Sequence, residues 1–363
     1  MRRRVHGTLE PLEADSEMDV VEPAAVTPEA SETQARAVTE VSLSSRILRP
    51  RTAISFLIAA AIVAFAFSRL NLNLGDVLRE MSHANPLYLG VAFVSYYGAL
   101  GLRALRWQTL LGSADIQPGE GKTIPKYPGL TLIFVLSWFV NCIVPAKLGD
   151  AYRGYLLKER SRASFSATLG TIFAERLVDL ITLAAFLVGS AYLVFGHHLP
   201  SVVSSWMDFA VALGVVLLVG TLAAFRFRTY LRALIPERVR HHYVNLEAGV
   251  LGSFGRMPTV LALTAVIWLL EGVRLYFVGV SVGAGIGVLG ALFVALLASL
   301  LTVVPITPAG LGFVEVGVVG VLSLMGAAQQ TAASVALLDR VVAYWSVLAV
   351  GAMLYLVSRW RWR

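Results

Sequence analysis

Apolar runs separated by short polar connections occupy the chain from about residue 50 to its end. The uninterrupted runs that can cross a bilayer as helices are Ala53–Ser68, Leu87–Leu102, Phe165–Phe195, Trp206–Phe225, Pro258–Val280 and Thr331–Val357. Two further runs, at about 130–157 and 288–325, are interrupted by proline, glycine or charged residues. The pattern predicts an all-α polytopic membrane protein with about six full spans and two broken helical segments.

The two broken segments carry the same motif at their interruption. Both read P-A-x-L-G, starting at Pro145 and at Pro308. A second pair of similar pentapeptides follows, AERLV beginning 29 residues after Pro145 at Ala174, and LDRVV beginning 30 residues after Pro308 at Leu338. Two matched motifs at matched spacing indicate a duplicated unit. We expect the repeat halves to cover about 50–200 and 201–363.

The composition supports the membrane class. Hydrophobic residues make up 57% of the 363 residues, and the single cysteine excludes a disulfide framework. The formal charge of +7 comes largely from basic residues beside the apolar runs, which membrane topology explains better than nucleic-acid binding. Because no metal-ligand spacing, P-loop or catalytic serine motif occurs, we expect no metal or other cofactor and no direct use of ATP.

The distribution of basic residues predicts the topology. Connections assigned to one side of the membrane hold 19 Lys and Arg, whereas the alternate connections hold 2. This asymmetry obeys the positive-inside rule only if each broken segment is a re-entrant hairpin that returns to the side it entered. The chain would then cross six times, in a plasma or inner membrane, with both termini cytosolic and the two halves inverted. In the alternative, every hairpin arm crosses and the chain has ten spans.

Residues 1–45 differ from the rest. They hold nine Asp and Glu, four Arg and no apolar run. This composition predicts a disordered cytosolic tail before a membrane domain over 46–363. The basic start is followed by no signal-peptide apolar region, so we expect no cleavage.

Ionisable residues inside membrane segments are costly and are usually functional or paired. The candidate substrate-binding residues are Asn141, Lys147, Asp150, Arg153, Glu175, Arg176, Asp179, Glu315, Asp339 and Arg340. The residues expected to shape the hairpin tips are Pro145, Gly149, Pro305, Pro308, Gly310 and Gly312.

Two interpretations of the embedded charges remain open. Lys147 and Arg153 lie where a helix end exposes backbone N–H groups, an arrangement that suits a lipid phosphate. Alternatively, the charges are buried ion pairs, such as Glu271 with Arg274 three residues later. Arg103 is interpreted as a flanking residue at the end of the second span.

Four motifs together resemble a known family. They are Asn141–Arg153, Ala174–Asp179, Pro305–Glu315 and Leu337–Arg340. They resemble the lysylphosphatidylglycerol synthase transmembrane-region family, or flippase-like domain, which includes the N-terminal membrane half of the multiple peptide resistance factor. The resemblance implies movement of phospholipids or lipid-linked sugars between leaflets. The larger synthases add a soluble aminoacyl-transfer domain, and since this sequence ends at Arg363 we expect that activity to be absent.

The sequence therefore predicts a transporter rather than an enzyme, which moves a phospholipid or a polyprenyl-linked substrate between leaflets. The expected partners are membrane lipids, with a membrane glycosyltransferase or another lipid-modifying enzyme as a candidate and no nucleic acid. Two alternatives stay open: an enzyme that acts on a lipid-linked substrate, and a non-catalytic partner of a membrane glycosyltransferase.

Overall fold

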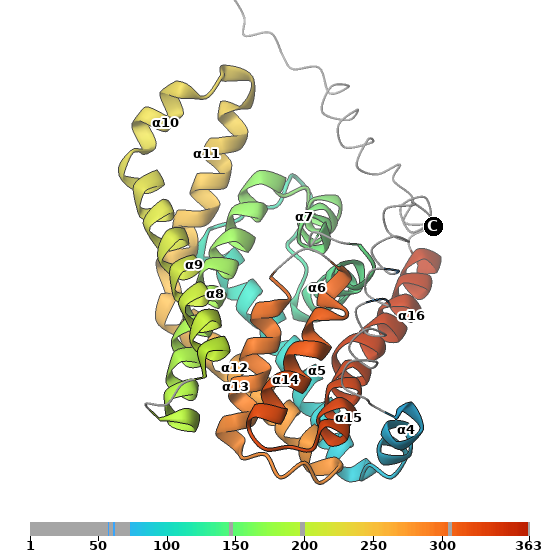
Figure 1. The fold of residues 1–363 in the computed structure, drawn as a ribbon. Coiled ribbons are helices and arrows are strands. Elements are labelled where there is room, and N and C mark those ends of the chain that lie inside the picture. The colour runs from blue at the N-terminus through green and yellow to red at the C-terminus, as the bar shows by residue number, and fades with distance from the viewer. Residues whose placement is uncertain are drawn as a thin grey trace, which may run out of the picture. The chain divides into compact units, whose positions relative to one another are not determined.

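A computed structural model describes residues 73–144, 148–196, 200–303 and 307–361, together with Leu57 and Ala61. Helices separated by short connections make up this part of the chain (Figure 1). The helices are α4 (Leu74–Ser82), α5 (Pro86–Ser113), α6 (Tyr127–Ile143), α7 (Leu148–Ser161), α8 (Phe165–Phe195), α9 (Ser201–Arg226), α10 (Arg228–Leu234), α11 (Glu237–Gly252), η1 (Ser253–Arg256), α12 (Met257–Ser281), α13 (Val288–Leu301), η2 (Pro308–Gly310), α14 (Phe313–Leu324), α15 (Gln329–Arg340), η3 (Val341–Trp345) and α16 (Ser346–Arg361). Residues 1–56, including the predicted tail, lie outside the described part.

Four helical stretches in the described part are long and apolar enough to cross a membrane: 165–195, 201–226, 237–281 and 329–357. The third joins α11, η1 and α12 into 45 residues, and the fourth joins α15, η3 and α16. Shorter apolar helices form the broken segments. The fold is therefore a helical membrane domain, as predicted. The predicted span Ala53–Ser68 falls almost wholly outside the described residues, so the number of crossings stays a prediction.

The prediction that the second span ends at Arg103 is wrong. α5 continues to Ser113, and both Arg103 and Arg106 are buried, at 6% and 0% exposure. The helix continues because the residues after Arg106 are again largely apolar, and Trp107, Leu110 and Leu111 are buried in the core. Two arginines thus lie inside the helix packing rather than at its boundary.

α5 and α12 form an antiparallel pair in the middle of the domain. Asn85 N, before the start of α5, donates to Ser281 O at the end of α12, over 2.9 Å. At the opposite end, Gly252 approaches Ala114 so closely that a Cβ on the glycine would meet the alanine Cα at 2.6 Å. The two helices therefore run in opposite directions along their whole length.

Each broken segment folds back on itself. In the first, Gly119 N, which precedes α6, donates to Ser161 O at the end of α7 over 2.9 Å. In the second, Gly290 near the start of α13 contacts the side chain of Met325, which follows α14. The outer ends of each hairpin thus lie together.

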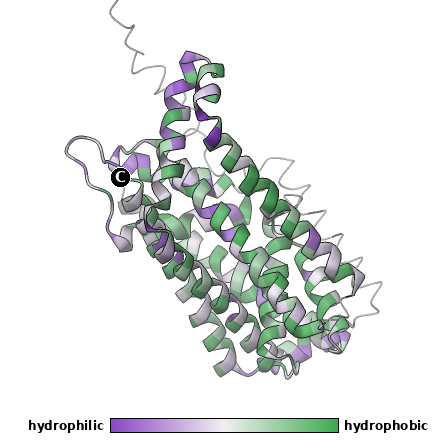
Figure 2. Cartoon of the chain, turned by 90° about the vertical axis from the view of Figure 1, so that its left-hand side faces the viewer, coloured by the Kyte–Doolittle hydropathy of each residue, from purple (hydrophilic) through white to green (hydrophobic). Residues whose placement is uncertain are grey.

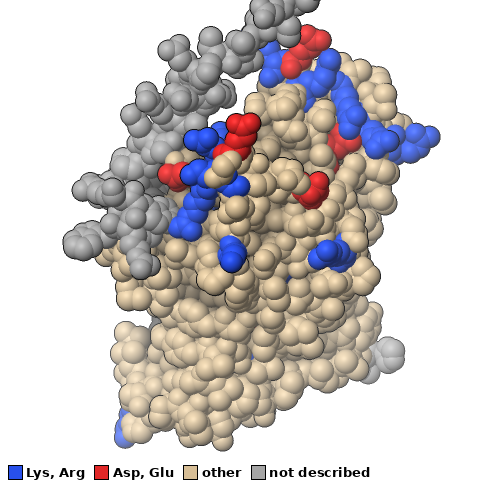
Figure 3. Space-filling model, turned by 180° about the vertical axis from the view of Figure 1, so that it is seen from behind, with Lys and Arg blue, Asp and Glu red and all other residues tan. Residues whose placement is uncertain are grey.

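Polar and apolar surfaces separate along the molecule. Charged side chains gather at the end that carries α10, α11 and the end of α7, above a broad uncharged surface (Figure 3). The α10–α11 arm is the most hydrophilic part, whereas α9 beside it is strongly hydrophobic (Figure 2). On α9, Phe209, Val216 and Leu222 are 41%, 66% and 57% exposed. Such a surface is stable in lipid rather than in water.

Candidate functional site

The tip of the first hairpin is held by polar contacts between its two arms. Asn141 Oδ1 accepts from Gly149 N over 2.8 Å, and Ser137 Oγ donates to Gly149 O over 2.8 Å. A side chain at Gly149 would collide with the Ser137 carbonyl and with the Asn141 side chain. Gly149 therefore permits the close approach of the arms, and Asn141 satisfies one of the first backbone N–H groups of α7. The predicted residues Pro145 and Lys147 lie outside the described part.

The second hairpin turns through left-handed backbone. Gly310 and Gly312 have φ of 70° and 87°, a region that glycine enters without strain. Glu315 Oε2 accepts from Gly312 N over 2.6 Å and so caps α14. Thr307 Oγ1 donates to Leu311 O over 2.7 Å. Both glycines therefore lie at the turn, and their role in shaping the tip stays a prediction. Pro308 begins η2, and Pro305 lies outside the described residues.

A buried ion cluster joins α5, α7 and α8. Arg106, fully buried on α5, donates to Glu175 Oε1 over 2.8 Å and to both carboxylate oxygens of Asp179. Arg153 on α7 donates to Glu175 Oε2 over 2.8 Å. The Arg153 guanidinium lies 4.8 Å from the ring centres of Trp107 and of Phe134. Glu175 thus bridges two arginines away from water.

Arg176 completes this cluster at its more exposed edge. Its Nε and Nη2 each donate to a different oxygen of Asp150 over 2.8 Å, and Nη1 lies 3.5 Å from Asp179. Asp150, in the first turn of α7, therefore fastens the hairpin to α8. This fork geometry is among the strongest that an arginine and a carboxylate form.

A second cluster joins α5, α12 and α15. Arg103 Nη2 lies 2.9 Å from Glu271 Oε1, and Arg274 Nη2 lies 3.2 Å from Glu271 Oε2. Arg274 Nη2 also lies 3.3 Å from Asp339 Oδ1, outside good hydrogen-bonding geometry. The predicted pair Glu271–Arg274 is confirmed, and four alternating charges form a chain from α5 through α12 to α15.

The second hairpin has a pair of its own. Arg340 Nε donates to Glu315 Oε1 over 2.7 Å, and Tyr344 Oη donates to Cys142 O at the end of α6 over 2.9 Å. Tyr344 lies in η3, a π-helical turn that follows Arg340 directly. Such turns often occur at functional sites. In the described part, these networks bring six arginines and six carboxylates together, so the charges balance.

The two halves make corresponding contacts. The spacing of Arg103 and Arg106 on α5 equals that of Glu271 and Arg274 on α12. In the first half, Arg176 on α8 binds Asp150 of the α6–α7 hairpin. In the second half, Arg340 on α15 binds Glu315 of the α13–α14 hairpin.

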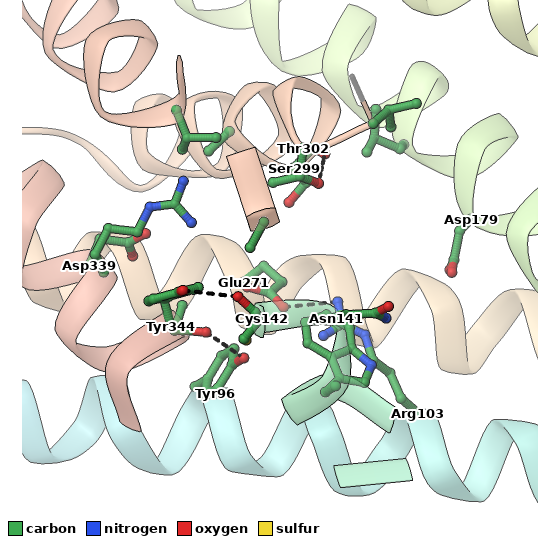
Figure 4. Close-up of a pocket in the computed structure, with 18 of the residues that line it drawn as sticks. Tyr96, Arg103, Asn141, Cys142, Asp179, Glu271, Ser299, Thr302, Asp339 and Tyr344 are labelled. Atoms are coloured by element: carbon green, nitrogen blue, oxygen red, sulfur yellow. Dashed lines mark hydrogen bonds and ion pairs between the residues drawn. The ribbon is translucent and has the colours of Figure 1, made fainter. Parts of the chain in front are cut away.

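A cavity of about 240 Å³ lies between the two hairpin tips and helices α5, α8 and α12. Figure 4 shows its labelled side chains arriving from several elements, with Arg103 on α5, Glu271 on α12, and Ser299 and Thr302 near the end of α13. Four arginines and three carboxylates line it, among aromatic and aliphatic side chains. The charged lining residues are Arg103, Arg176, Arg274, Arg340, Asp179, Glu271 and Asp339.

The structure separates the predicted binding residues into two groups. Asn141, Arg176, Asp179, Asp339 and Arg340 line the cavity. Asp150, Arg153, Glu175 and Glu315 do not line it and are held in ion pairs. Lys147 lies outside the described residues. The ion-pair interpretation accounts for this second group, while a binding role of the first group stays a prediction.

The sequence interpretation missed several residues of the cavity and its support, which are Tyr96, Arg103, Arg106, Trp138, Trp268 and Tyr344. Arg103 and Arg106 were missed because the span on α5 was ended too early. The four aromatic residues are uncharged, and an aromatic side chain inside an apolar run does not by itself indicate a polar cavity. The signal that could have found the arginines is their i, i+3 spacing, which repeats at Glu271 and Arg274.

Comparison with known proteins identifies the family of this chain. A family model described as the lysylphosphatidylglycerol synthase TM region matches residues 52–351. The chain belongs to this family. The match covers both hairpins, both ion clusters and the cavity, so the resemblance noted in the sequence motifs is confirmed.

Individual relatives of this chain include proteins that are named as membrane proteins. A UPF0104 membrane protein of Methanocaldococcus jannaschii is 34% identical over 223 residues, which are 61% of this chain and 95% of the relative. One from Methanothermobacter thermautotrophicus is 23% identical over 324 residues, 82% of this chain and 93% of the relative. Haloferax volcanii has a relative named glycosyltransferase AglD, 27% identical over 359 residues, which are 87% of this chain and 56% of that protein. These matches identify an integral, multi-pass membrane protein.

Proposed function

We propose that this chain is a lipid translocator that moves a phospholipid or a polyprenyl-linked lipid between leaflets without chemical change. The observation that carries the proposal is a charged cavity lined by the tips of two broken hairpins, inside a helical membrane domain. Polar groups at membrane depth are costly and are usually functional. Membership of the family supports the same interpretation.

The size of the cavity supports headgroup binding. A pocket that buries a drug-sized ligand usually measures about 300–1,000 Å³. At about 240 Å³ this cavity is smaller than that range, which favours a polar headgroup over a whole lipid as its occupant. We therefore propose that the headgroup passes the cavity while the chains remain in lipid.

The corresponding contacts of the two halves support an inverted repeat. α5 and α12 are second in their halves and run antiparallel, and each half closes an arginine–carboxylate pair on its own hairpin. We propose six crossings and two re-entrant hairpins, with the charged end of the molecule and both termini in the cytosol of the cell that carries this protein. Broken helices that meet between inverted repeats form the binding site in several transporters.

A liposome assay tests the function. Purified protein is reconstituted with fluorescent phospholipids, and a membrane-impermeant reductant bleaches the label in the outer leaflet. Translocation is expected to bleach the inner-leaflet pool as well, and Thr302→Phe, which fills the cavity, should slow this. Leu222→Phe on the lipid-facing surface of α9 is the matched control and should behave as wild type. If wild type and protein-free liposomes give the same rate for every lipid, the proposed function is wrong.

A second candidate function follows from one relative. The Haloferax volcanii protein carries a glycosyltransferase name. This chain could accordingly serve lipid-linked sugar transfer, as an enzyme or as the partner of one. Chromatographic analysis of the same liposomes distinguishes the candidates, because an enzyme changes the mass of the lipid whereas a translocator does not.

A further inference from the structure

Five polar side-chain atoms of residues that line the cavity have no hydrogen-bond partner within the described part of the chain. Four are donors: Arg103 Nη1, Arg274 Nε, Trp138 Nε1 and Trp268 Nε1. The fifth, Asp339 Oδ1, is an acceptor that lies 3.3 Å from Arg274 Nη2. Buried polar groups normally have a partner, which water or a ligand can supply. Since donors outnumber acceptors four to one, a ligand that satisfies these atoms is mainly an acceptor.

The Arg103 guanidinium is held in a defined position. It lies 4.8 Å from the ring centre of Trp138 and 5.9 Å from that of Trp268, and Nη2 is fixed by Glu271 at 2.9 Å. The Arg103 side chain is 7% exposed. A guanidinium between two aromatic rings is fixed in orientation and keeps its edge for hydrogen bonding. The free edge is Nη1.

The local charges favour an anionic acceptor at this position. Glu271 is the carboxylate that contacts Arg103, and it is shared with Arg274. The other cavity carboxylates are neutralised elsewhere, Asp179 by Arg106 and Arg176, and Asp339 by Arg274. Among the described cavity arginines, Arg103 thus combines two properties: its Nη1 has no hydrogen-bond partner, and its counter-ion Glu271 is shared with Arg274.

The balance of the whole network limits the charge of the ligand. Six arginines face six carboxylates in the described part, so binding adds uncompensated charge. One delocalised negative charge that accepts several hydrogen bonds is therefore favoured over two charges on one group.

We propose that Arg103, with the indole N–H groups of Trp138 and Trp268, binds the monoanionic phosphodiester of the transported lipid. This inference rests on the proposed function and narrows its substrate class. Arg103 Nη1 donates to one phosphate oxygen, and the two tryptophans supply further donors while they shield the guanidinium from water. Arg153, by contrast, is engaged by Glu175 behind the cavity.

The test measures lipid selectivity rather than rate alone. The liposome assay is run with three fluorescent lipids: phosphatidylglycerol as the phosphodiester, phosphatidic acid as the phosphomonoester, and glucosylceramide as a lipid without phosphate. Wild type should move phosphatidylglycerol at least about tenfold faster than glucosylceramide, the scale of one charge-assisted hydrogen bond. Phosphatidic acid should be slower than phosphatidylglycerol. Arg103→Gln should bring phosphatidylglycerol down to the rate of glucosylceramide.

Controls separate binding from folding. Trp138→Phe and Trp268→Phe keep the rings but remove the N–H groups, and each should lower the phosphatidylglycerol preference several-fold. Arg232→Gln is the matched control, since Arg232 pairs with Glu247 over 2.9 Å and neither residue lines the cavity. Both belong to the α10–α11 arm at one end of the domain (Figure 1). It should leave the ratio unchanged. A folding defect in Arg103→Gln would slow all three lipids equally.

The outcomes distinguish the proposals. If wild type moves all lipids at one rate, the phosphodiester site is wrong while translocation stands. The same holds if Arg103→Gln keeps both the wild-type rate for glucosylceramide and the wild-type ratio. Faster movement of phosphatidic acid than of phosphatidylglycerol overturns the monoanion assignment. If inorganic phosphate binds the purified protein in an Arg103-dependent way while phosphatidylglycerol does not, the site binds the free ion and the lipid assignment is overturned. If wild type moves none of the lipids, translocation itself is wrong.

Discussion

The buried bridge of Glu175 between Arg106 and Arg153 provides a quantitative test of the structure. We consider Glu175→Gln, which keeps the shape of the side chain and removes its charge. Arg106 would retain Asp179 as a counter-ion. Arg153 would lose its carboxylate and keep only the rings of Trp107 and Phe134.

The magnitude follows from burial. Glu175 and Arg153 are both 0% exposed, so water cannot hydrate the remaining charge. Breaking a buried pair by removing one partner costs about 3–5 kcal/mol. Arg153→Met in the same chain removes the unpaired charge and refills most of its volume. The double variant should therefore recover most of the loss, since replacing both partners of a buried pair by groups of similar shape is often nearly neutral.

The measurement is the free energy of unfolding in mixed detergent micelles for wild type, both single variants and the double variant. We expect a coupling energy of about 2–3 kcal/mol between the two positions, within the range seen for residues in contact. Additive losses would show that the two side chains do not touch. A Glu175→Gln variant as stable as wild type would refute the fully buried placement of Arg153.

Three further predictions concern the hairpin, the topology and the tail. Gly149→Ala should destabilise the protein by about 1–3 kcal/mol in a thermal melt, because the added methyl group collides with the opposite hairpin arm. The control Gly98→Ala adds its methyl group in open space on α5 and should be neutral or stabilising. Equal effects of the two substitutions would contradict the close approach of the hairpin arms. Single cysteines at Arg238 and Gly283, in a background without the native cysteine, should be labelled from opposite sides of the membrane, and labelling from one side would contradict the proposed topology. Deletion of residues 2–40 should leave membrane insertion and translocation near wild type, and loss of insertion would show that the tail is required.

The sequence alone was sufficient for the helical membrane class, the family and the position of the hairpin breaks. The length of an apolar run and the positions of glycine and proline determine helix ends locally. α8 therefore begins and ends at the predicted residues, and the described helices of both broken runs end or begin at the P-A-x-L-G motifs. Local spacing also predicted the pair Glu271–Arg274, because residues three apart on a helix are neighbours.

Only the tertiary structure decided which charged side chains form ion pairs with one another. Arg106 lies 69 residues from Glu175 in the chain, and no periodicity within one helix relates such partners. Arg153 was predicted to face a ligand and is instead sealed behind the cavity, while Arg103 was interpreted as a flanking residue and instead lines it. A buried charge is stable only beside its counter-charge, and the helix packing, above all the antiparallel contact of α5 and α12, determines where that counter-charge lies.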